Sequence, residues 1–287
     1  MEGVSNRLLR SCASALAEPL CHIFNLSLVK SVFPLSWKST VVQPIYKQKG
    51  DRSVPTNYRP IALLPCVSKV LEGFVRKQLL SYCLENDLIP DEQYGFLPKR
   101  STTWPLLAVL DQWEKALDEG HFVHACFLDV AKAFDRVDHD LLLSRLSSLG
   151  VQKSELAWFA SYLQHRNIST TVDGVLSSPL PITSGVPQGS VLGPLLFILF
   201  FRDLPATVSS DCALFADDTL VYNTSCKGDG SPWCCNLQHG YGQCLVVGRV
   251  MVHNVQCQQV CPHGGQATPC GYESACDISS TVCCSAR

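Results

Sequence analysis

The stretch at residues 214–222 constrains the fold most, because it places two adjacent acids, Asp217 and Asp218, inside an apolar, β-prone run. Neighbouring carboxylates repel each other and lose hydration in such surroundings unless a cation lies beside them. The apolar residues on both sides predict two short strands, with the acids at the tight turn between them. Asp217 and Asp218 are therefore predicted to bind a metal ion.

A second source of acid is expected elsewhere in the chain, because Mg²⁺ prefers oxygen ligands and is commonly held by one or two carboxylates plus water and substrate phosphates. Asp129 fits, since it follows the apolar residues Phe127 and Leu128 at a predicted strand end. A carboxylate at a strand end that faces a carboxylate pair is the arrangement of two-metal phosphoryl transfer. The sequence thus predicts Asp129, Asp217 and Asp218 as ligands of two Mg²⁺ ions, with Mn²⁺ as an alternative.

Several segments, in their order along the chain, resemble motifs of reverse transcriptases from non-LTR, LINE-type retrotransposons of the jockey-related group. They are residues 57–61 (NYRPI), 93–96 (QYGF), 127–135 (FLDVAKAFD), 185–194 (GVPQGSVLGP) and 215–218 (FADD). The resemblance covers roughly residues 4–225. It implies RNA-directed DNA polymerisation, with an RNA template, a DNA primer and deoxynucleoside triphosphates as partners, and Asp129, Asp217 and Asp218 as the catalytic residues.

A basic loop follows the predicted strand at residues 40–46 and precedes another at residues 58–64. This arrangement would place Lys47 and Arg59 around one anionic ligand, such as the phosphates of a nucleoside triphosphate. By the resemblance, Arg59 contacts the triphosphate, and Lys47 is a looser assignment. The alternative for both is an exposed charge without a ligand.

A Gly- and Pro-rich loop at residues 185–190 precedes the apolar segment 191–201. Glycine lets a backbone approach a base or sugar closely, and Gln188 can hydrogen-bond without adding charge. The resemblance implies that Gln188 and Gly189 hold the nascent base pair. It also places Phe134 beneath the incoming sugar, where a ring would exclude a 2′-hydroxyl; the alternative is a core phenylalanine.

The predicted fold is α+β, with a small antiparallel sheet that carries the acids and packs on helices. Apolar spacing predicts helices at residues 4–32 (interrupted at Pro19), 68–84, 103–117, 138–149 and 151–163. In the helix at 103–117, Trp104, Leu107 and Leu110 are at core spacing, and Asp138 or His139 is expected to cap the helix at 138–149. The resemblance implies a right-hand polymerase, with fingers over residues 1–110 and a palm over 111–225. The thumb and the primer grip are not recognisable, so the chain is interpreted as truncated at both ends.

Residues 226–287 differ from the rest of the chain: they hold ten of its sixteen cysteines, but only six charged residues and two leucines. Irregular spacing disfavours a zinc module, and nothing indicates the oxidising compartment that a disulfide framework needs. Both stay open as alternatives. The favoured interpretation is a disordered or out-of-frame tail without a function.

The net charge is −2, which is unusual for a nucleic-acid binder. However, residues 1–60 hold eight Lys/Arg against three Asp/Glu, whereas residues 111–225 hold seven against fourteen. A basic region facing an acidic one suits a polymerase, and local variation in charge is the alternative. No secretory leader or membrane span is recognised, so we expect an intracellular protein without a membrane partner; a nuclear location follows only from the resemblance.

The sequence therefore predicts an RNA-directed DNA polymerase that transfers nucleotides by a two-metal mechanism. A non-catalytic, retrotransposon-derived remnant that at most binds nucleic acid or a divalent metal is the alternative. Because the parts that hold the primer are not recognisable, we expect weak activity or none from the isolated chain.

Overall fold

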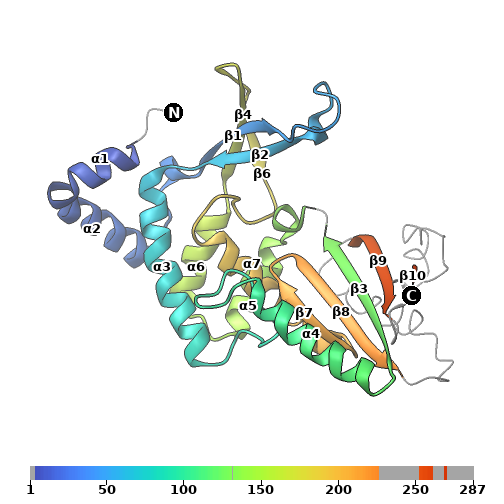
Figure 1. Cartoon of the computed structure of the whole chain (residues 1–287). Coiled ribbons are helices and arrows are strands. Elements are labelled where there is room, and N and C mark those ends of the chain that lie inside the picture. Colours follow the sequence, from blue (N-terminus) through green and yellow to red (C-terminus); the bar gives the residue numbers. More distant parts are fainter. Residues whose placement is uncertain (1–3, 131, 226–251, 261–267, 270–287) are drawn as a thin grey trace, which may run out of the picture.

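The computed structural model describes residues 4–130, 132–225, 252–260 and 268–269. Its helices are α1 (Asn6–Ser11), α2 (Ala13–Val29), α3 (Cys66–Glu85), α4 (Thr103–Asp118), α5 (His139–Ser148), α6 (Lys153–Leu163), α7 (Gly193–Phe201) and α8 (Leu204–Thr207), with short 3-10 helices η1 (Leu35–Trp37), η2 (Pro55–Asn57) and η3 (Ala133–Arg136). Its strands are β1 (Ser39–Tyr46), β2 (Tyr58–Leu63), β3 (Phe122–Val130), β4 (Arg166–Val172), β5 (Val175–Leu176), β6 (Leu180–Ile182), β7 (Asp211–Phe215), β8 (Asp218–Ser225), β9 (Val252–Val260) and β10 (Thr268–Pro269). The strands form two sheets, one at the top of Figure 1 and one at the lower right, and several helices lie to the left.

The first sheet has the order β2-β1-β4-β5, and β6 also pairs with β4. β1 is antiparallel to β2 but parallel to β4, so this sheet joins segments that are far apart in the sequence. β4 and β5 are connected by Asp173 and Gly174, which both have positive φ (50° and 80°). Two central residues with positive φ are typical of the type I′ hairpin turn, as the Asp-Gly pair predicts.

The second sheet has the order β10-β9-β3-β8-β7, and its pairs are antiparallel. Successive side chains of a strand point to opposite faces. On one face, Ala125 and Tyr222 pack with Val109 of α4, which lies across the sheet in Figure 1. On the other face, Cys126 and Val221 belong to a second apolar cluster. Apolar clusters therefore cover both faces of the sheet that carries the acids.

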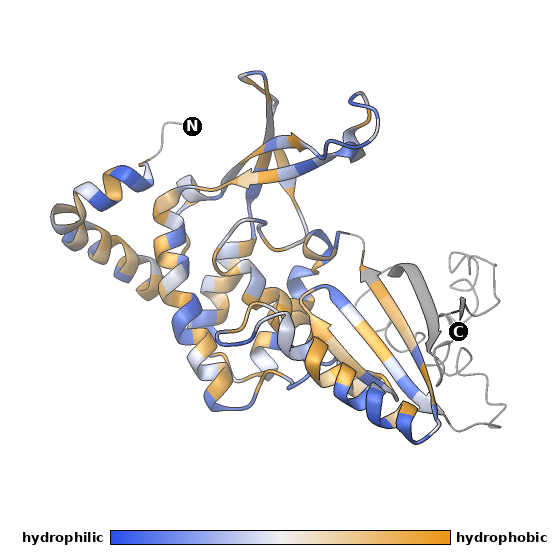
Figure 2. Ribbon diagram, in the orientation of Figure 1, coloured by the Kyte–Doolittle hydropathy of each residue, from blue (hydrophilic) through white to orange (hydrophobic). Residues whose placement is uncertain are grey.

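The main core surrounds α7, which is apolar along its whole length and is drawn largely orange in Figure 2. A helix that is hydrophobic on all sides is stable only when it is buried on all sides. Buried side chains of α3, α5 and α6 surround it, and Trp158 of α6 stacks on Tyr162 with ring centroids 5.6 Å apart. The α+β class is thus confirmed as a mixed arrangement of helices and sheets.

Two expectations from apolar spacing are wrong in detail. α2 continues through Pro19, and the interruption falls instead at Cys12, between α1 and α2. In α4, Trp104, Leu107 and Leu110 are not core residues but are 61%, 58% and 47% exposed. Apolar spacing identifies residues that share a helix face, but it does not show whether another element covers that face.

The remaining predicted helices are found as α3, α5 and α6, close to their predicted ends. Asp138 caps α5, because its Oδ1 accepts a hydrogen bond from the Leu141 N–H at 2.9 Å, as its position before the helix predicts. Within the described residues, no helix combines the length and the apolar character needed to span a membrane.

The division of the chain into three regions stays a prediction. Part of the range 226–287, where a disordered tail is expected, is described as β9, which pairs antiparallel with β3, and β10, which pairs with β9. The rest of that range lies outside the described residues.

Candidate active site

The predicted hairpin of two strands is confirmed, but Asp218 is the first residue of β8 and, of the two acids, only Asp217 lies between the strands. β7 and β8 pair antiparallel up to Phe215 and Asp218, so Ala216 and Asp217 form a two-residue turn. Asp217 is half-buried and Asp218 is exposed. Ala216 is buried and has a φ of 63°, in the left-handed region that residues with a Cβ rarely adopt. The surrounding structure must therefore stabilise this turn.

Asp129 belongs to the strand next to the hairpin. β3 pairs antiparallel with β8, and the last pair is Leu128 with Thr219. Asp129 directly follows Leu128, at a point where the pairing of β3 with β9 shifts register, and it lies at the end of β3 that is next to the start of β8. The structure therefore brings the three predicted acids to the same end of neighbouring strands.

The chemistry of this set fits a hard cation, because carboxylate oxygens are the ligands that Mg²⁺ and Mn²⁺ prefer. The side chain of Asp129 is outside the part of the structure that is described. Among the side chains that are described, no group of three or more His, Cys, Asp and Glu residues is close enough to hold a metal ion. Binding of two ions by Asp129, Asp217 and Asp218 thus stays a prediction.

The segment at residues 92–95 lies against the hairpin. The Leu214 N–H donates to the Glu92 carbonyl, and the Tyr94 N–H donates to the Leu214 carbonyl, both at 2.8 Å. The Oε1 atom of Gln93, which is 2% exposed, accepts hydrogen bonds from the N–H of Gly95 (2.8 Å) and of Ala216 (3.1 Å). Sequence reasoning missed this contact of Gln93, because it joins residues that lie 123 positions apart in the chain.

The Gly-rich loop docks on the residues that follow β3. The Gly185 N–H donates to the Val137 carbonyl at 2.7 Å, and Gln188 Nε2 donates to Asp135 Oδ1 at 2.8 Å. Gly185 has a φ of 90°, and a Cβ there would lie 2.8 Å from the Asp135 Cα. Only glycine fits this close approach without strain. The structure thus brings Gln188 next to the segment that contains Phe134.

Phe134 is half-buried and lies between two other rings. It stacks on Phe197 of α7 with centroids 4.4 Å apart and an interplanar angle of 15°, and it forms a T-shaped pair with Phe96 with centroids 6.1 Å apart. This packing agrees with the alternative of a core side chain, although part of the residue is still exposed. A role in sugar selection stays a prediction.

Lys47 and Arg59 both belong to the β1–β2 hairpin region, where Arg59 pairs with Ile45. Arg59 is exposed, whereas Lys47 Nζ donates to the Thr56 carbonyl at 2.9 Å within its own loop. Gly189 (φ 73°) approaches β2 as well, since a Cβ there would lie 2.9 Å from the Ala62 carbonyl oxygen. The Gly-rich loop therefore touches the strand that carries Arg59.

A buried carboxylate fixes the start of the apolar helix after this loop. Glu72 of α3 is 1% exposed, and its Oε2 accepts hydrogen bonds from the N–H of Val191 (2.8 Å) and Leu192 (3.3 Å). Burial raises the pKa of Glu72, although these bonds and the buried Arg166 favour the ionised form. Sequence reasoning missed Glu72; the available signal was a charged residue directly after Leu71 in the apolar stripe of α3.

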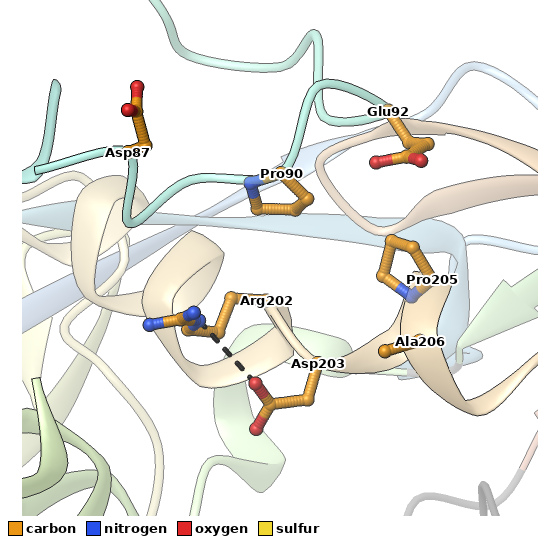
Figure 3. Close-up of a pocket in the computed structure, with 7 residues that line it drawn as sticks. All are labelled: Asp87, Pro90, Glu92, Arg202, Asp203, Pro205 and Ala206. Carbon is orange, nitrogen blue, oxygen red and sulfur yellow. Dashed lines mark ion pairs between the residues drawn. The ribbon is translucent and has the colours of Figure 1, made fainter.

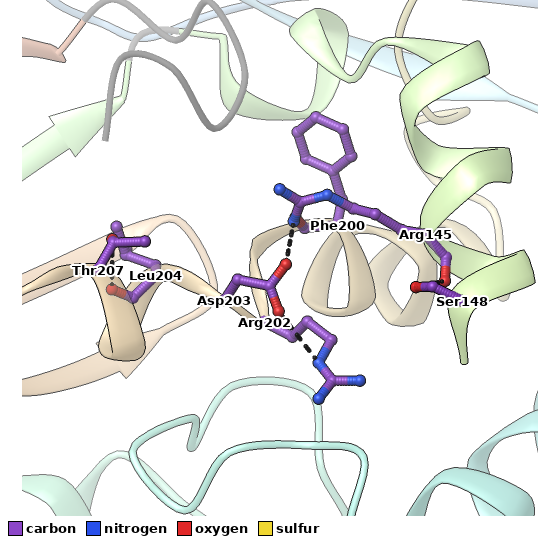
Figure 4. A network of polar contacts seen from close by, with 7 residues as sticks. All are labelled: Arg145, Ser148, Phe200, Arg202, Asp203, Leu204 and Thr207. Carbon is purple, nitrogen blue, oxygen red and sulfur yellow. Dashed lines mark hydrogen bonds and ion pairs between the residues drawn. The ribbon is translucent and has the colours of Figure 1, made fainter. Parts of the chain in front are cut away.

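Arginine contacts fix the other end of α7, as Figure 4 shows. Arg145 of α5 donates to the Phe200 carbonyl and pairs with Asp203 at 3.4 Å. Arg202 Nε also lies 3.4 Å from Asp203. Helix α7, which links the Gly-rich loop to the segment before the hairpin, is therefore anchored at both ends.

A cavity of about 330 Å³ lies near this network (Figure 3). It is lined by Asp87, Pro90, Glu92, Arg202, Asp203, Pro205 and Ala206. None of the predicted site residues lines it, so we do not assign it to the candidate active site.

A carboxylate turn beside an acid-bearing strand, with a Gly-rich loop docked nearby, is typical of nucleotidyl-transferring polymerases. Residues 45–247 match the family described as reverse transcriptase (RNA-dependent DNA polymerase), and the chain belongs to this family. The match continues past β8 into the range that sequence analysis treats as a tail.

Curated relatives support the retrotransposon resemblance. The chain is 34% identical over 230 residues to the RNA-directed DNA polymerase from mobile element jockey of Drosophila melanogaster, a match that covers 77% of this chain and 25% of that protein. It is 33% identical over 246 residues to the probable RNA-directed DNA polymerase from transposon BS of the same organism, covering 80% and 26%. The chain thus spans about a quarter of the length of these relatives, and the predicted likeness to non-LTR retrotransposon enzymes is confirmed.

Proposed function

We propose that this chain forms the catalytic region of an RNA-directed DNA polymerase of a non-LTR retrotransposon. In the proposed reaction, the 3′-hydroxyl of a DNA primer attacks the α-phosphate of a deoxynucleoside triphosphate, and pyrophosphate leaves. The observation that carries the proposal is the Asp217–Asp218 turn beside the end of β3, which bears Asp129. Family membership and the names of the relatives support the same reaction.

The acids would provide the metal site. Asp129 and Asp217 would hold two Mg²⁺ ions, and Asp218 would assist on the primer side. Such ions, when bound, lower the pKa of the attacking hydroxyl and stabilise the leaving pyrophosphate. The chain's own contribution is to hold the carboxylates in fixed directions, because a positional error of about 1 Å can cost about a hundredfold in rate.

The β1–β2 hairpin would bind the charged part of the nucleotide. Arg59 is exposed on β2, and a guanidinium can pair with phosphate through two parallel hydrogen bonds. Lys47 is the weaker candidate, because its ammonium group already donates one hydrogen bond to the Thr56 carbonyl within its own loop and has fewer donors left for a phosphate.

The Gly-rich loop and Phe134 would act on the base and the sugar. Gly189 lets the loop lie close to β2, and Gln188 would hydrogen-bond to the nascent base pair after leaving Asp135. Phe134 would exclude a 2′-hydroxyl, and its stacking on Phe197 would keep the ring in place.

Primer extension tests the proposal. Purified chain is incubated with a DNA primer on an RNA template, deoxynucleotides and Mg²⁺, alongside the double variant Asp217→Asn/Asp218→Asn. Asp211→Asn is the matched control, because Asp211 lies at the opposite end of the same hairpin and is exposed. Circular dichroism and thermal unfolding show that each protein is folded.

We expect weak extension by the parent chain and by Asp211→Asn, and none by the double variant. Extension by the double variant would refute the role of the turn. No product from any folded variant would refute polymerisation by this chain and leave the non-catalytic alternative, which binding of the primer–template duplex then tests.

A further inference from the structure

We propose that Gln93 is a positioning residue for the Asp217–Asp218 turn. Its carboxamide oxygen holds the backbone at Ala216 and thereby fixes the direction in which the following carboxylates point. The inference rests on the proposed metal-binding role of the turn. However, the hold on Ala216 can be measured separately from metal binding and catalysis.

The contact between Gln93 and the turn is buried and specific. Gln93 Oε1 accepts from the Ala216 N–H at 3.1 Å across 123 residues of sequence, and from the Gly95 N–H at 2.8 Å. Gln93 is 2% exposed and Ala216 is 4% exposed. A buried N–H without a partner is costly, so the amide of Ala216 depends on this oxygen.

The turn needs such a hold because its conformation is unfavourable by itself. Ala216 has a φ of 63°, and the left-handed region is unfavourable for a residue with a Cβ. A turn of this kind persists when surrounding contacts over-determine it. If the hydrogen bond to Gln93 is lost, Ala216 can relax and Asp217, the next residue, changes direction.

Gln93 is itself held from both sides. The carbonyl of Glu92 and the N–H of Tyr94 bond to Leu214 at 2.8 Å each, so the segment lies like an additional short strand beside β7. Arg100 Nη1 donates to the Gln93 carbonyl at 2.6 Å and to the Asp91 carbonyl at 2.9 Å. These contacts fix the position of the Gln93 carboxamide next to the Ala216 N–H.

Gly95 allows this close approach. A Cβ at residue 95 would lie 2.3 Å from the Ala216 nitrogen, a distance that real side chains do not show. The segment 93–95 thus combines a residue that binds the turn with a residue that leaves room for it.

Hydrogen–deuterium exchange at the Ala216 amide tests the hold, with single-residue resolution from electron-transfer fragmentation. Gln93→Met keeps the approximate shape but removes the acceptor, and Gln93→Glu keeps an oxygen acceptor. Gln164→Met is the matched control, because Gln164 is exposed at the end of α6. Arg100→Met removes the hydrogen bonds from Arg100 to the Gln93 and Asp91 carbonyls but leaves the Gln93 carboxamide unchanged. It provides a second test if Gln93→Met does not fold.

We expect exchange at Ala216 to be roughly tenfold faster in Gln93→Met, from the loss of one buried hydrogen bond, and faster to a smaller extent in Arg100→Met. Gln93→Glu should restore slow exchange, and Gln164→Met should match the parent. Unchanged exchange in both Gln93→Met and Arg100→Met would overturn the proposal.

Binding of Mn²⁺, measured by electron paramagnetic resonance, tests the consequence for the carboxylates. We expect Gln93→Met to bind Mn²⁺ several-fold more weakly than the parent and Gln93→Glu to recover binding. Equal affinity in the parent and Gln93→Met, with faster exchange in the latter, would overturn the positioning role. A parent protein that binds no Mn²⁺ would refute the metal site in the proposed function, and the exchange result would still decide whether Gln93 holds the turn.

Discussion

The close contact between Gly95 and the carboxylate turn predicts a large cost for one added methyl group. In Gly95→Ala, the new Cβ would lie 2.3 Å from the Ala216 nitrogen and 3.0 Å from the Ala216 Cα. Non-bonded heavy atoms prefer about 3.5 Å or more, so the two segments must separate by roughly 1 Å. That movement stretches or breaks the 3.1 Å hydrogen bond from Ala216 to Gln93.

Two effects contribute to the expected loss of stability. Overpacking of a filled site costs about 1–3 kcal/mol, and a lost hydrogen bond costs about 1 kcal/mol. Gly95→Ala should therefore lower the free energy of unfolding by about 2–4 kcal/mol, which corresponds to a decrease in Tm of roughly 5–15 °C for a domain of this size.

Gly73→Ala is the matched control, because it makes the same chemical change where there is room. Gly73 lies inside α3, and no atom comes within 4 Å of an added Cβ. Alanine in a helix interior is more favourable than glycine by roughly 0.5–1 kcal/mol. This variant should be slightly more stable than the parent.

Urea unfolding followed by circular dichroism measures both variants on the same scale. The reasoning is refuted if Gly95→Ala unfolds within about 0.5 kcal/mol of the parent, or if both alanine variants lose equal stability. In the first case the segment moves aside freely, and in the second the effect is not specific to the turn.

Three further predictions concern single side chains. Burial lowers the pKa of His124 in the folded protein below its value of about 6.5 in the unfolded chain. The stability that the neutral side chain provides is therefore present above about pH 6.5 and is lost as the pH falls through the folded pKa. His124→Gln should make the free energy of unfolding depend less on pH between pH 7 and 5. Burial raises the pKa of Cys83 to about 11, so mass spectrometry should find Cys83 alkylated much more slowly than the exposed Cys21 at pH 8, and equal rates would contradict this. Phe134→Val should weaken discrimination against ribonucleotides in primer extension by roughly tenfold, and an unchanged ratio would favour the core role.

Local signals in the sequence predicted the hairpin and several helices well. The acids at 217 and 218 interrupt an apolar run and thereby mark the connection between two strands, and Asp138 precedes α5 at a capping position. In both cases, the residues that determine the structure lie within a few positions of one another.

The remaining features depend on contacts between distant segments. The parallel pairing of β1 with β4 and the bond from Ala216 to Gln93 each join residues more than one hundred positions apart, and neither leaves a periodic signal. Contacts between distant segments also determine whether another element covers a helix face, which is why Trp104 is exposed despite its apolar spacing.

The segment at residues 92–95 also has a consequence for solubility. β7 is the last strand of its sheet, and such strands present unpaired backbone groups that can recruit another chain. The bonds from Leu214 to Glu92 and Tyr94 occupy part of this edge. The same few residues that support the carboxylate turn thus also occupy part of an edge at which another chain could pair.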